Sequence, residues 1–302
     1  MSKVFLGVDT SNYTTSVSLC VDGEIVSNIK VPIPVESGER GVRQSEALFS
    51  HVKSLPVAFE KLGKVRPDAI GVSERPRDIE GSYMPCFLAG VSVATSMASL
   101  LGVPLYRFSH QRGHIRAAVY SSKMPGYEKF IAFHVSGGTT EMLLVDGDNI
   151  ELIGKSLDIN AGQLIDRVGV MLGMGFPCGR ELESVADYNG VELKTCVRGL
   201  DCNLSGLENM AARMHKDGRD ISKIAGFTIL NVERTLDKMT ANALKKYGDL
   251  PLLYAGGVMS NRRIKESFTK KYGAYFAEPQ FSADNAAGCA LLCMDSYNKQ
   301  YK

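Results

Sequence analysis

The strongest constraint on the fold is an internal repeat of short strands and tight turns. Three strand-like runs, separated by a polar turn and an Asp-Gly hairpin signal, lie at 4–9, 14–21 and 24–31. The same three runs return about 125 residues later, at 130–135, 139–145 and 149–157. In this correspondence Asp22-Gly23 matches Asp146-Gly147, and Thr14-Thr15 matches Thr139-Thr140. Two copies of one strand pattern predict a duplicated domain.

Helical patterns and further strands follow each copy of the repeat. After the first copy we expect helices at 45–63 and 86–102 and strands at 68–74 and 104–108. After the second copy we expect helices at 161–173, 227–248 and 261–273, strands at 251–257 and 274–279, and a polar irregular zone at 187–206. This alternation predicts an α/β fold whose two halves face each other across a cleft.

Composition is that of an ordinary globular protein. The chain has 302 residues, of which 44% are hydrophobic and 23% are charged, and this length favours two domains or one large domain. The net charge of +2 neither requires nor excludes a nucleic-acid partner. The N-terminus does not resemble a signal peptide, and no run approaches 18 apolar residues, so we expect a cytoplasmic protein without a membrane partner. Seven cysteines without paired spacing are expected to be reduced and structural, with Cys289 and Cys293 buried on one helix face.

Two histidines four residues apart, His110 and His114, form a candidate metal-binding pair. On a helix this spacing stacks both imidazoles on one face. A metallopeptidase with this spacing needs a glutamate directly after the first histidine, and here that position is Gln111, which cannot accept a proton at neutral pH. The spacing alone leaves open that the pair only caps or packs near a helix start.

Three polar or glycine-rich turns follow predicted strands, at 10–14, 135–140 and 255–258. Ligands of paired α/β folds bind where strands end and loops converge, so these turns are expected to line the cleft. The turn at 135–140 is the strongest candidate, because its two glycines allow phosphate oxygens to approach the main chain. A bare tight turn remains the alternative. Asn261, at the start of a predicted helix, could reach a ligand, cap the helix or do both.

The chain resembles the TsaD family, also called Gcp and formerly O-sialoglycoprotein endopeptidase. The motifs that carry the resemblance, in this order along nearly the whole chain, are HQRGH, VSGGTTE, GQLIDRVGVMLGMGFPCG, GGVMSNR and FSADNAA. The resemblance implies the actin-like ATPase or sugar-kinase fold, with two ribonuclease-H-like domains around a nucleotide cleft. It also implies transfer of a threonylcarbamoyl group from its adenylate to the N6 amine of a tRNA adenosine.

Site residues carried over from the family fall into two groups. The implied metal ligands are His110, His114 and Asp284, which would hold iron or zinc and leave positions open for substrate oxygens. The implied contacts to ATP or a threonylcarbamoyl-adenylate-like nucleotide are His134, Val135, Ser136, Gly137, Gly138, Asp166, Gly179 and Asn261. Without the family match, Asp166 is a surface charge on a helix and Asp284 is a helix N-cap. No catalytic side chain is assigned.

Domain boundaries and partners follow from the same resemblance. We expect one domain at 1–125 with a C-terminal helix at 285–302, and a second domain at 126–284. The expected partners are an adenine nucleotide, tRNA, and a second copy of this chain or another protein with the actin-like fold.

Several positions depart from the family pattern. The run Asn12 to Thr15 replaces Cys-Asp-Glu-Thr, and 75–81, with Arg75 and Arg77, replaces a glycine-rich turn. Thr139 occupies a position where the family has a histidine, and Glu208 occupies a position where the family has a lysine. We interpret the chain as a divergent paralogue whose acceptor can differ. A non-catalytic nucleotide- and metal-binding subunit that pairs with another actin-like protein is the alternative, and a glycoprotease is a weaker one.

Overall fold

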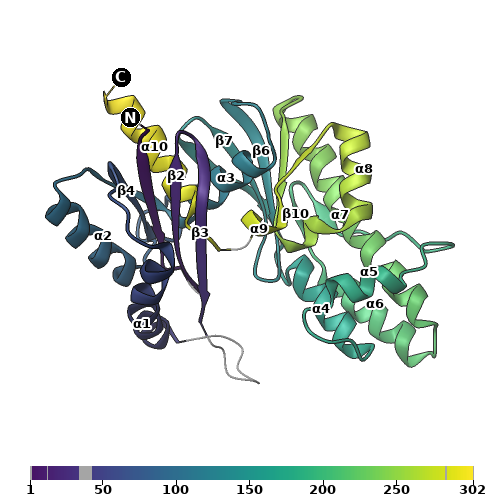
Figure 1. Cartoon of the computed structure of the whole chain (residues 1–302). Helices are drawn as coiled ribbons and strands as arrows, with labels where there is room; N and C mark the ends of the chain where they lie inside the picture. Colours follow the sequence, from purple (N-terminus) through teal and green to yellow (C-terminus); the bar gives the residue numbers. More distant parts are fainter. Residues whose placement is uncertain (1, 12, 34–42, 283, 302) are drawn as a thin grey trace. The chain divides into compact units, whose positions relative to one another are not determined.

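The computed structural model describes residues 2–11, 13–33, 43–282 and 284–301 (Figure 1). The chain divides into two compact units, Met1–Tyr120 with Gln280–Lys302, and Ser121–Pro279. We call them unit 1 and unit 2. The units change at 120/121 and 279/280, whereas the domains expected from the sequence change at 125/126 and 284/285.

Unit 1 is a five-stranded sheet covered by helices on both faces. Its strands are β1 (Val4–Asp9), β2 (Thr14–Val21), β3 (Glu24–Pro32), β4 (Ala69–Arg75) and β5 (Leu105–Ser109), in the order β3-β2-β1-β4-β5. Its helices are α1 (Gln44–Leu62), α2 (Phe87–Leu101), α3 (His110–Ser121), α9 (Pro279–Ser282) and α10 (Ala287–Tyr301). The hairpinned strands β1, β2 and β3 are antiparallel, and β4 and β5 run parallel to β1.

Alternation along the strands of unit 1 sorts side chains onto two faces. Leu6 and Val8 of β1, with Val17 of β2, pack beneath α1 and α2. Phe5 of β1 and Cys20 of β2 point the other way, into the apolar cluster formed with α10. Odd-numbered residues of β1 and even-numbered residues of β2 therefore share the α10 face.

Unit 2 repeats the strand order of unit 1. Its sheet contains β6 (Lys129–Val135), β7 (Thr140–Asp146), β8 (Asn149–Lys155), β11 (Leu252–Ala255) and β12 (Tyr275–Phe276), in the order β12-β11-β6-β7-β8. The remaining elements are α4 (Ala161–Met171), α5 (Gly179–Val185), β9 (Val197–Arg198), β10 (Asp201–Cys202), α6 (Ser205–Lys216), α7 (Ile221–Tyr247), η1 (Gly257–Ser260) and α8 (Arg262–Tyr272). Three antiparallel strands followed by two parallel ones recur in both units, which confirms the predicted duplication and the α/β class.

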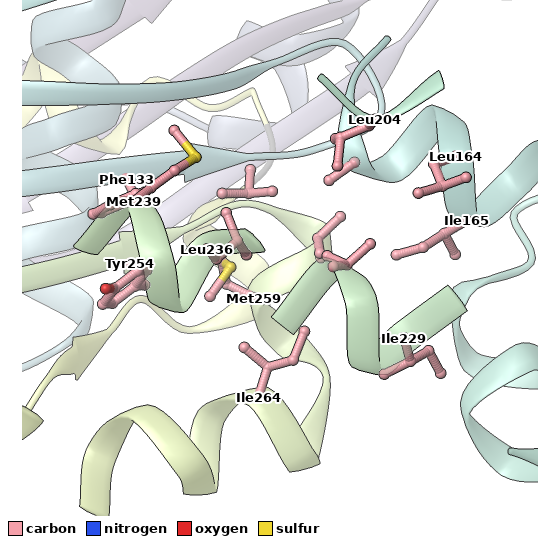
Figure 2. Close-up of a cluster of buried hydrophobic side chains, with 14 of the residues drawn as sticks. Phe133, Leu164, Ile165, Leu204, Ile229, Leu236, Met239, Tyr254, Met259 and Ile264 are labelled. Carbon is pink, nitrogen blue, oxygen red and sulfur yellow. The ribbon is translucent and has the colours of Figure 1, made fainter. Parts of the chain in front are cut away.

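The core of unit 2 lies between its sheet, α4 and the long helix α7. Figure 2 shows part of this cluster: Phe133 and Tyr254 from the sheet stack at 4.8 Å between ring centroids, and Leu236 and Met239 of α7 lie beside them. Thr240 and the hydroxyl of buried Tyr254 lie 2.7 Å apart, which satisfies a polar group that burial would otherwise penalise. This core fixes the carboxyl ends of β6 and β11.

Two expectations about local structure need adjustment. The loop between β2 and β3 is Asp22-Gly23, with positive φ at both residues, but the loop between β7 and β8 is Gly147-Asp148. The second Asp-Gly pair is therefore offset by one residue from the first. The zone expected to be irregular, 187–206, contains the short hairpin of β9 and β10 and the start of α6 at Ser205.

All seven cysteines are free of disulfides, and Cys289 and Cys293 are buried on α10 as expected. Among the described helices, none is long and apolar enough to cross a lipid bilayer.

Candidate metal centre and nucleotide-binding turns

Helix α3 begins at His110, directly after strand β5, and places both predicted histidines on one face. Their ring centroids lie 4.2 Å apart, and their Nε2 atoms are 2.7 Å apart. Each side chain is mostly buried, at 18% exposure for His110 and 13% for His114. The two histidines therefore lie on one helix face, as their four-residue spacing predicts.

Asp284 lies beside the two histidines although it is 170 residues from His114 along the chain. Its Oδ1 atom is 3.2 Å from Nε2 of His114 and 3.5 Å from Nε2 of His110. The three side chains form one group with ligand atoms within 4.8 Å of one another. The structure thus brings together the whole predicted ligand set within unit 1, and we call it the His-His-Asp cluster.

Glycines let α10 approach its neighbours closely, and this approach positions Asp284. A Cβ at Gly288 would lie only 1.8 Å from the carbonyl oxygen of Gly113, which is between the two histidines on α3. A Cβ at Gly7 of β1 would lie 2.3 Å from the carbonyl oxygen of Ala286. The side-chain oxygen of Asn285 accepts a hydrogen bond from the Ala287 amide at the start of α10. The capping role considered for Asp284 therefore belongs to its neighbour, and Asp284 is left to face the histidines.

Asp9 is a functional candidate that the sequence analysis missed. It ends β1 on the α10 face, is 1% exposed, and its Oδ2 atom lies 2.8 Å from Nδ1 of His110. The hydroxyl of Ser73 donates to the same oxygen, and the Ser11 amide donates to Oδ1 at 2.8 Å. A carboxylate on the far nitrogen of a ligating histidine fixes its tautomer and orientation. The sequence feature that could have identified Asp9 is its position at the end of a predicted apolar strand.

The electrostatics of the His-His-Asp cluster favour a positive charge. Burial acts to lower the pKa of His110, but the carboxylates of Asp9 and Asp284 outweigh it and raise that pKa to about 10. Burial acts to raise the pKa of Asp284, but His110 and His114 hold it well below its usual range. The pKa of Asp9 is likewise lowered by His110 against the effect of burial. A site that stabilises a proton on imidazole also stabilises a metal cation in its place.

The donor set fits a divalent transition metal. Neutral imidazole and carboxylate are ligands of both zinc and iron. Ligands at about 2.1 Å from one ion with tetrahedral angles stand about 3.4 Å apart, close to the 3.2 Å and 3.5 Å separations from Asp284. The histidine nitrogens, at 2.7 Å, would need to part by about 0.7 Å. His110, His114 and Asp284 would supply three protein ligands to such an ion, which would leave a position for substrate.

The turn at 136–138 of unit 2 lies at the carboxyl end of β6, next to parallel strand β11. The Ser136 amide donates to the carbonyl oxygen of Thr139 at 2.7 Å, and Gly137 and Gly138 are exposed. A Cβ at Gly162 of α4 would lie 2.5 Å from the Gly137 amide nitrogen, so the helix start abuts the turn. Parallel strand ends, an open glycine turn and a helix N-terminus together can bind a phosphate.

A second contact joins the turn region to β11. A Cβ at Gly256 would lie 2.2 Å from the carbonyl oxygen of Val135, and the φ of Gly256 is 102°. The residue must be glycine for the chain after β11 to lie against the end of β6. In the register of these strands, Ala255 stands opposite His134. The segments 134–138 and 255–257 are therefore neighbours, as the sequence analysis expected.

The other predicted nucleotide residues have identifiable structural partners. Oδ1 of Asp166 accepts a hydrogen bond from the Cys178 amide at 2.9 Å, next to Gly179 at the exposed start of α5. Burial raises the pKa of Asp166 against the effect of this bond. Oδ1 of Asn261 accepts from the Ile264 amide at 3.0 Å and so caps α8. The capping alternative for Asn261 is observed, and its role toward a ligand stays a prediction.

Two of the residues that depart from the family pattern, Arg75 and Glu208, form ion pairs within their own units. Arg75 forms ion pairs with Glu74 and Asp78 within unit 1, and these two carboxylates also pair with Arg107 and Arg112. Glu208 pairs with Arg167 at 3.2 Å. Of the run from 12 to 15, Asn12 lies outside the described residues.

Solved structures with the same fold define the class of protein. The full-length HypF structure in its phosphate- and nucleotide-bound form superposes with a TM-score of 0.64 at 13% identity, over 99% of this chain and 56% of that chain. A ROK hexokinase from Thermus thermophilus gives a TM-score of 0.54 at 17% identity, over 98% and 99% of the two chains. The protein therefore has the fold of the actin-like ATPases and sugar kinases, as predicted.

Sequence relatives narrow this class to one family. The family model for TsaD, tRNA N6-adenosine threonylcarbamoyltransferase, matches residues 33–291. A protein of this name from Dictyoglomus turgidum is 31% identical over 99% of this chain and 95% of its own length. One from Thermus thermophilus is 32% identical over 98% of this chain and 94% of its own length. The chain belongs to the TsaD family, which confirms the resemblance seen in its motifs.

Proposed function

We propose that this protein transfers a threonylcarbamoyl group from an adenylate to the N6 amine of an adenosine in tRNA. The observation that carries the proposal is the His-His-Asp cluster of unit 1 in a chain of the TsaD family. In the reaction the adenine N6 attacks the carbamoyl carbon and loses a proton. The bond from that carbon to the phosphate oxygen breaks, and AMP leaves.

His110, His114 and Asp284 are the groups that would hold a divalent ion, zinc or iron. Such an ion supplies Lewis acidity toward an oxygen of the donor. Asp9 keeps the Nδ1 atom of His110 protonated and its Nε2 atom turned toward the cluster, because a carboxylate at 2.8 Å accepts only from N–H. Asp9 is therefore a positioning residue for this site.

The nucleotide portion of the donor is assigned to unit 2. Because the Ser136 amide already donates to Thr139, the backbone N–H groups of Gly137 and Gly138 are the candidates for its phosphate. Oδ1 of Asp166 is used by Cys178, which leaves Oδ2 available to a ribose hydroxyl. Oδ1 of Asn261 is used as a helix cap, which leaves its NH2 group available on the adenine side. For both residues, a structural role is compatible with a ligand contact.

The remaining partners follow from this reaction. A tRNA substrate favours a cytoplasmic protein. Pairing with a second actin-like chain is supported by apolar side chains exposed on α1, where Phe49 is 64% and Val52 is 55% exposed. A glycoprotease is not favoured, because Gln111 cannot act as the general base of such a site.

The test is reconstitution of the transfer. Purified zinc- or iron-loaded protein is mixed with threonylcarbamoyl-adenylate and unmodified tRNA, and the digested nucleosides are analysed by mass spectrometry. We expect threonylcarbamoyladenosine with the unaltered protein and at least a roughly 100-fold slower formation with His110→Ala.

His215→Ala is the matched control, since His215 is an exposed histidine in the last turn of α6. Product formation by this variant should equal that of the unaltered protein. If the unaltered protein retains metal and consumes no donor with tRNA present, tRNA is not its acceptor and the proposal is wrong. Equal activity of His110→Ala and the unaltered protein would exclude the cluster from the reaction.

A further inference from the structure

A row of polar side chains crosses the sheet of unit 1 on the α10 face. Asp9 of β1 stands opposite Ser16 of β2, and Ser16 stands opposite Lys30 of β3. Directly opposed residues on neighbouring strands point to the same side of the sheet, with Cβ atoms about 5 Å apart. Since Asp9 contacts His110, the row extends from the His-His-Asp cluster towards the edge strand β3.

Lys30 is a half-buried cation at the far end of this row. Its Nζ atom donates to the carbonyl oxygen of Gln280 at 2.6 Å, which brings it beneath α9, the short helix just before Asp284. Among the described residues, no carboxylate forms an ion pair with it. Burial lowers the pKa of Lys30, and the nearby charge of Asp284 acts to raise it. An ammonium group has several donors, so one carbonyl does not use its hydrogen-bonding capacity.

Ser16 lies between Asp9 and Lys30 and has an unsatisfied hydroxyl. The residue is 0% exposed, and its Oγ atom has no hydrogen-bond partner within the described part of the chain. Leaving a buried hydroxyl without a partner costs free energy, and native proteins seldom do so unless a ligand or water completes the bond. This hydroxyl and the Lys30 ammonium are the hydrogen-bond donors of the row that begins at Asp9.

We propose that Lys30 and Ser16 form a subsite for the carboxylate of the amino-acid portion of the donor, next to the His-His-Asp cluster. This inference rests on the proposed function for the identity of the donor. A threonylcarbamoyl group keeps the carboxylate of threonine, and an ammonium with an adjacent hydroxyl is a suitable partner for it. The phosphate, the other anion of the donor, already has candidate partners in the backbone N–H groups of Gly137 and Gly138. Lys30 thereby selects donors that carry a free carboxylate.

The test compares two probes, N-carbamoyl-L-threonine and its amide, N-carbamoyl-L-threoninamide. Their affinities for zinc-loaded protein are measured by NMR titration, and the zinc content of each variant is measured in parallel. We expect the acid to bind the unaltered protein at least about tenfold more tightly than the amide. Lys30→Met should bring this ratio close to one and leave the affinity for the amide unchanged, whereas Lys30→Arg should retain part of the preference.

Control variants separate binding from folding. Lys64→Met removes an exposed lysine of the same unit and should keep the full preference. Lys30→Gln removes the charge but keeps a donor for Gln280, so it tests the proposal even if Lys30→Met does not fold. Ser16→Ala should weaken binding of the acid by a smaller factor than loss of Lys30.

Three outcomes would overturn the subsite. These are equal affinities of acid and amide for the unaltered protein, no binding of the acid at millimolar concentration, and a preference that survives both charge-removing variants. A carboxylate preference that depends on Lys30, found together with a failed tRNA assay, would refute the proposed acceptor and support the subsite.

Discussion

The substitution Gly288→Ala tests how the fold positions the His-His-Asp cluster. Gly288 belongs to α10, four residues after Asp284, and an added Cβ would lie 1.8 Å from the carbonyl oxygen of Gly113 on α3. Ordinary contact needs about 3.4 Å, so the two helices must part by about 1.5 Å. Because the neighbouring atom is backbone, no side-chain rotation can relieve the overlap. Overpacking of this kind destabilises a protein by about 1–3 kcal/mol.

The same movement separates Asp284 from the histidines. A shift of about 1.5 Å takes its Oδ1 atom from 3.2 Å and 3.5 Å to nearly 5 Å from the two Nε2 atoms, beyond the separation of ligands on one ion. We expect zinc affinity to fall at least about 100-fold, more than for a typical outer-shell substitution. The assay is competition with a chromophoric chelator, with thermal unfolding followed on the same samples.

Gly113→Ala is the matched control at the same helix pair. A Cβ there would meet Sγ of Cys289 at 3.5 Å and the Cys289 amide nitrogen at 3.9 Å, which are ordinary contacts. Zinc affinity and stability should therefore stay close to those of the unaltered protein. The reasoning is refuted if Gly288→Ala binds zinc with unaltered affinity, or if the two glycine variants lose affinity equally.

Three further predictions concern other parts of the molecule. Asp9→Asn should lower zinc affinity about 10- to 100-fold in the chelator assay while the fold is retained, and an unchanged affinity would remove Asp9 from its positioning role. Asp158→Ala should destabilise the protein by about 1–2 kcal/mol in urea unfolding, because its carboxylate accepts hydrogen bonds from the Leu204 and Ser205 amides at the start of α6. Burial raises the pKa of Asp158 but these bonds hold it well below its usual range, so the difference should shrink as the pH falls below about 4, and a constant difference would contradict this. Gly162→Ala should weaken ATP binding at least about tenfold in calorimetry by displacing the turn at 136–138, unlike Gly206→Ala, whose Cβ meets nothing within 4 Å.

The repeat and the histidine pair could be predicted from sequence because both are local patterns. Alternation of apolar residues marks strands, and the recurrence of three such runs identifies the duplicated sheet. A four-residue spacing places His110 and His114 on one helix face wherever that helix lies. Asp284 required the family resemblance, because no local pattern connects it to His114, which is 170 positions away, or to the still more distant His110.

Asp9 could not be assigned from the sequence because its role depends on tertiary contacts. Nδ1 of His110, at the start of α3, reaches its carboxylate only in the folded chain, because the two residues are 101 positions apart. The same holds for Ser73, which reaches Asp9 through the parallel pairing of β1 and β4. A single aspartate at a strand end has many possible partners, and the sequence alone does not identify the one that it contacts.

One other expectation differs from the structure for a reason of local chemistry. Helix α6 was overlooked because it begins in a polar stretch, where the Asp158 side chain from a distant segment supplies its cap. Hydrophobic periodicity does not predict helix caps or ion pairs between segments that are distant in the sequence.

The central claim is that His110, His114 and Asp284 bind one divalent ion. The most direct test is metal analysis by inductively coupled plasma mass spectrometry on protein purified without oxygen, for the unaltered chain, His114→Ala, Asp284→Ala and the control His215→Ala. We predict about one zinc or iron per chain in the unaltered protein and the control, and little in the two cluster variants. An unaltered protein without bound metal, or cluster variants that retain a full equivalent, would contradict the claim.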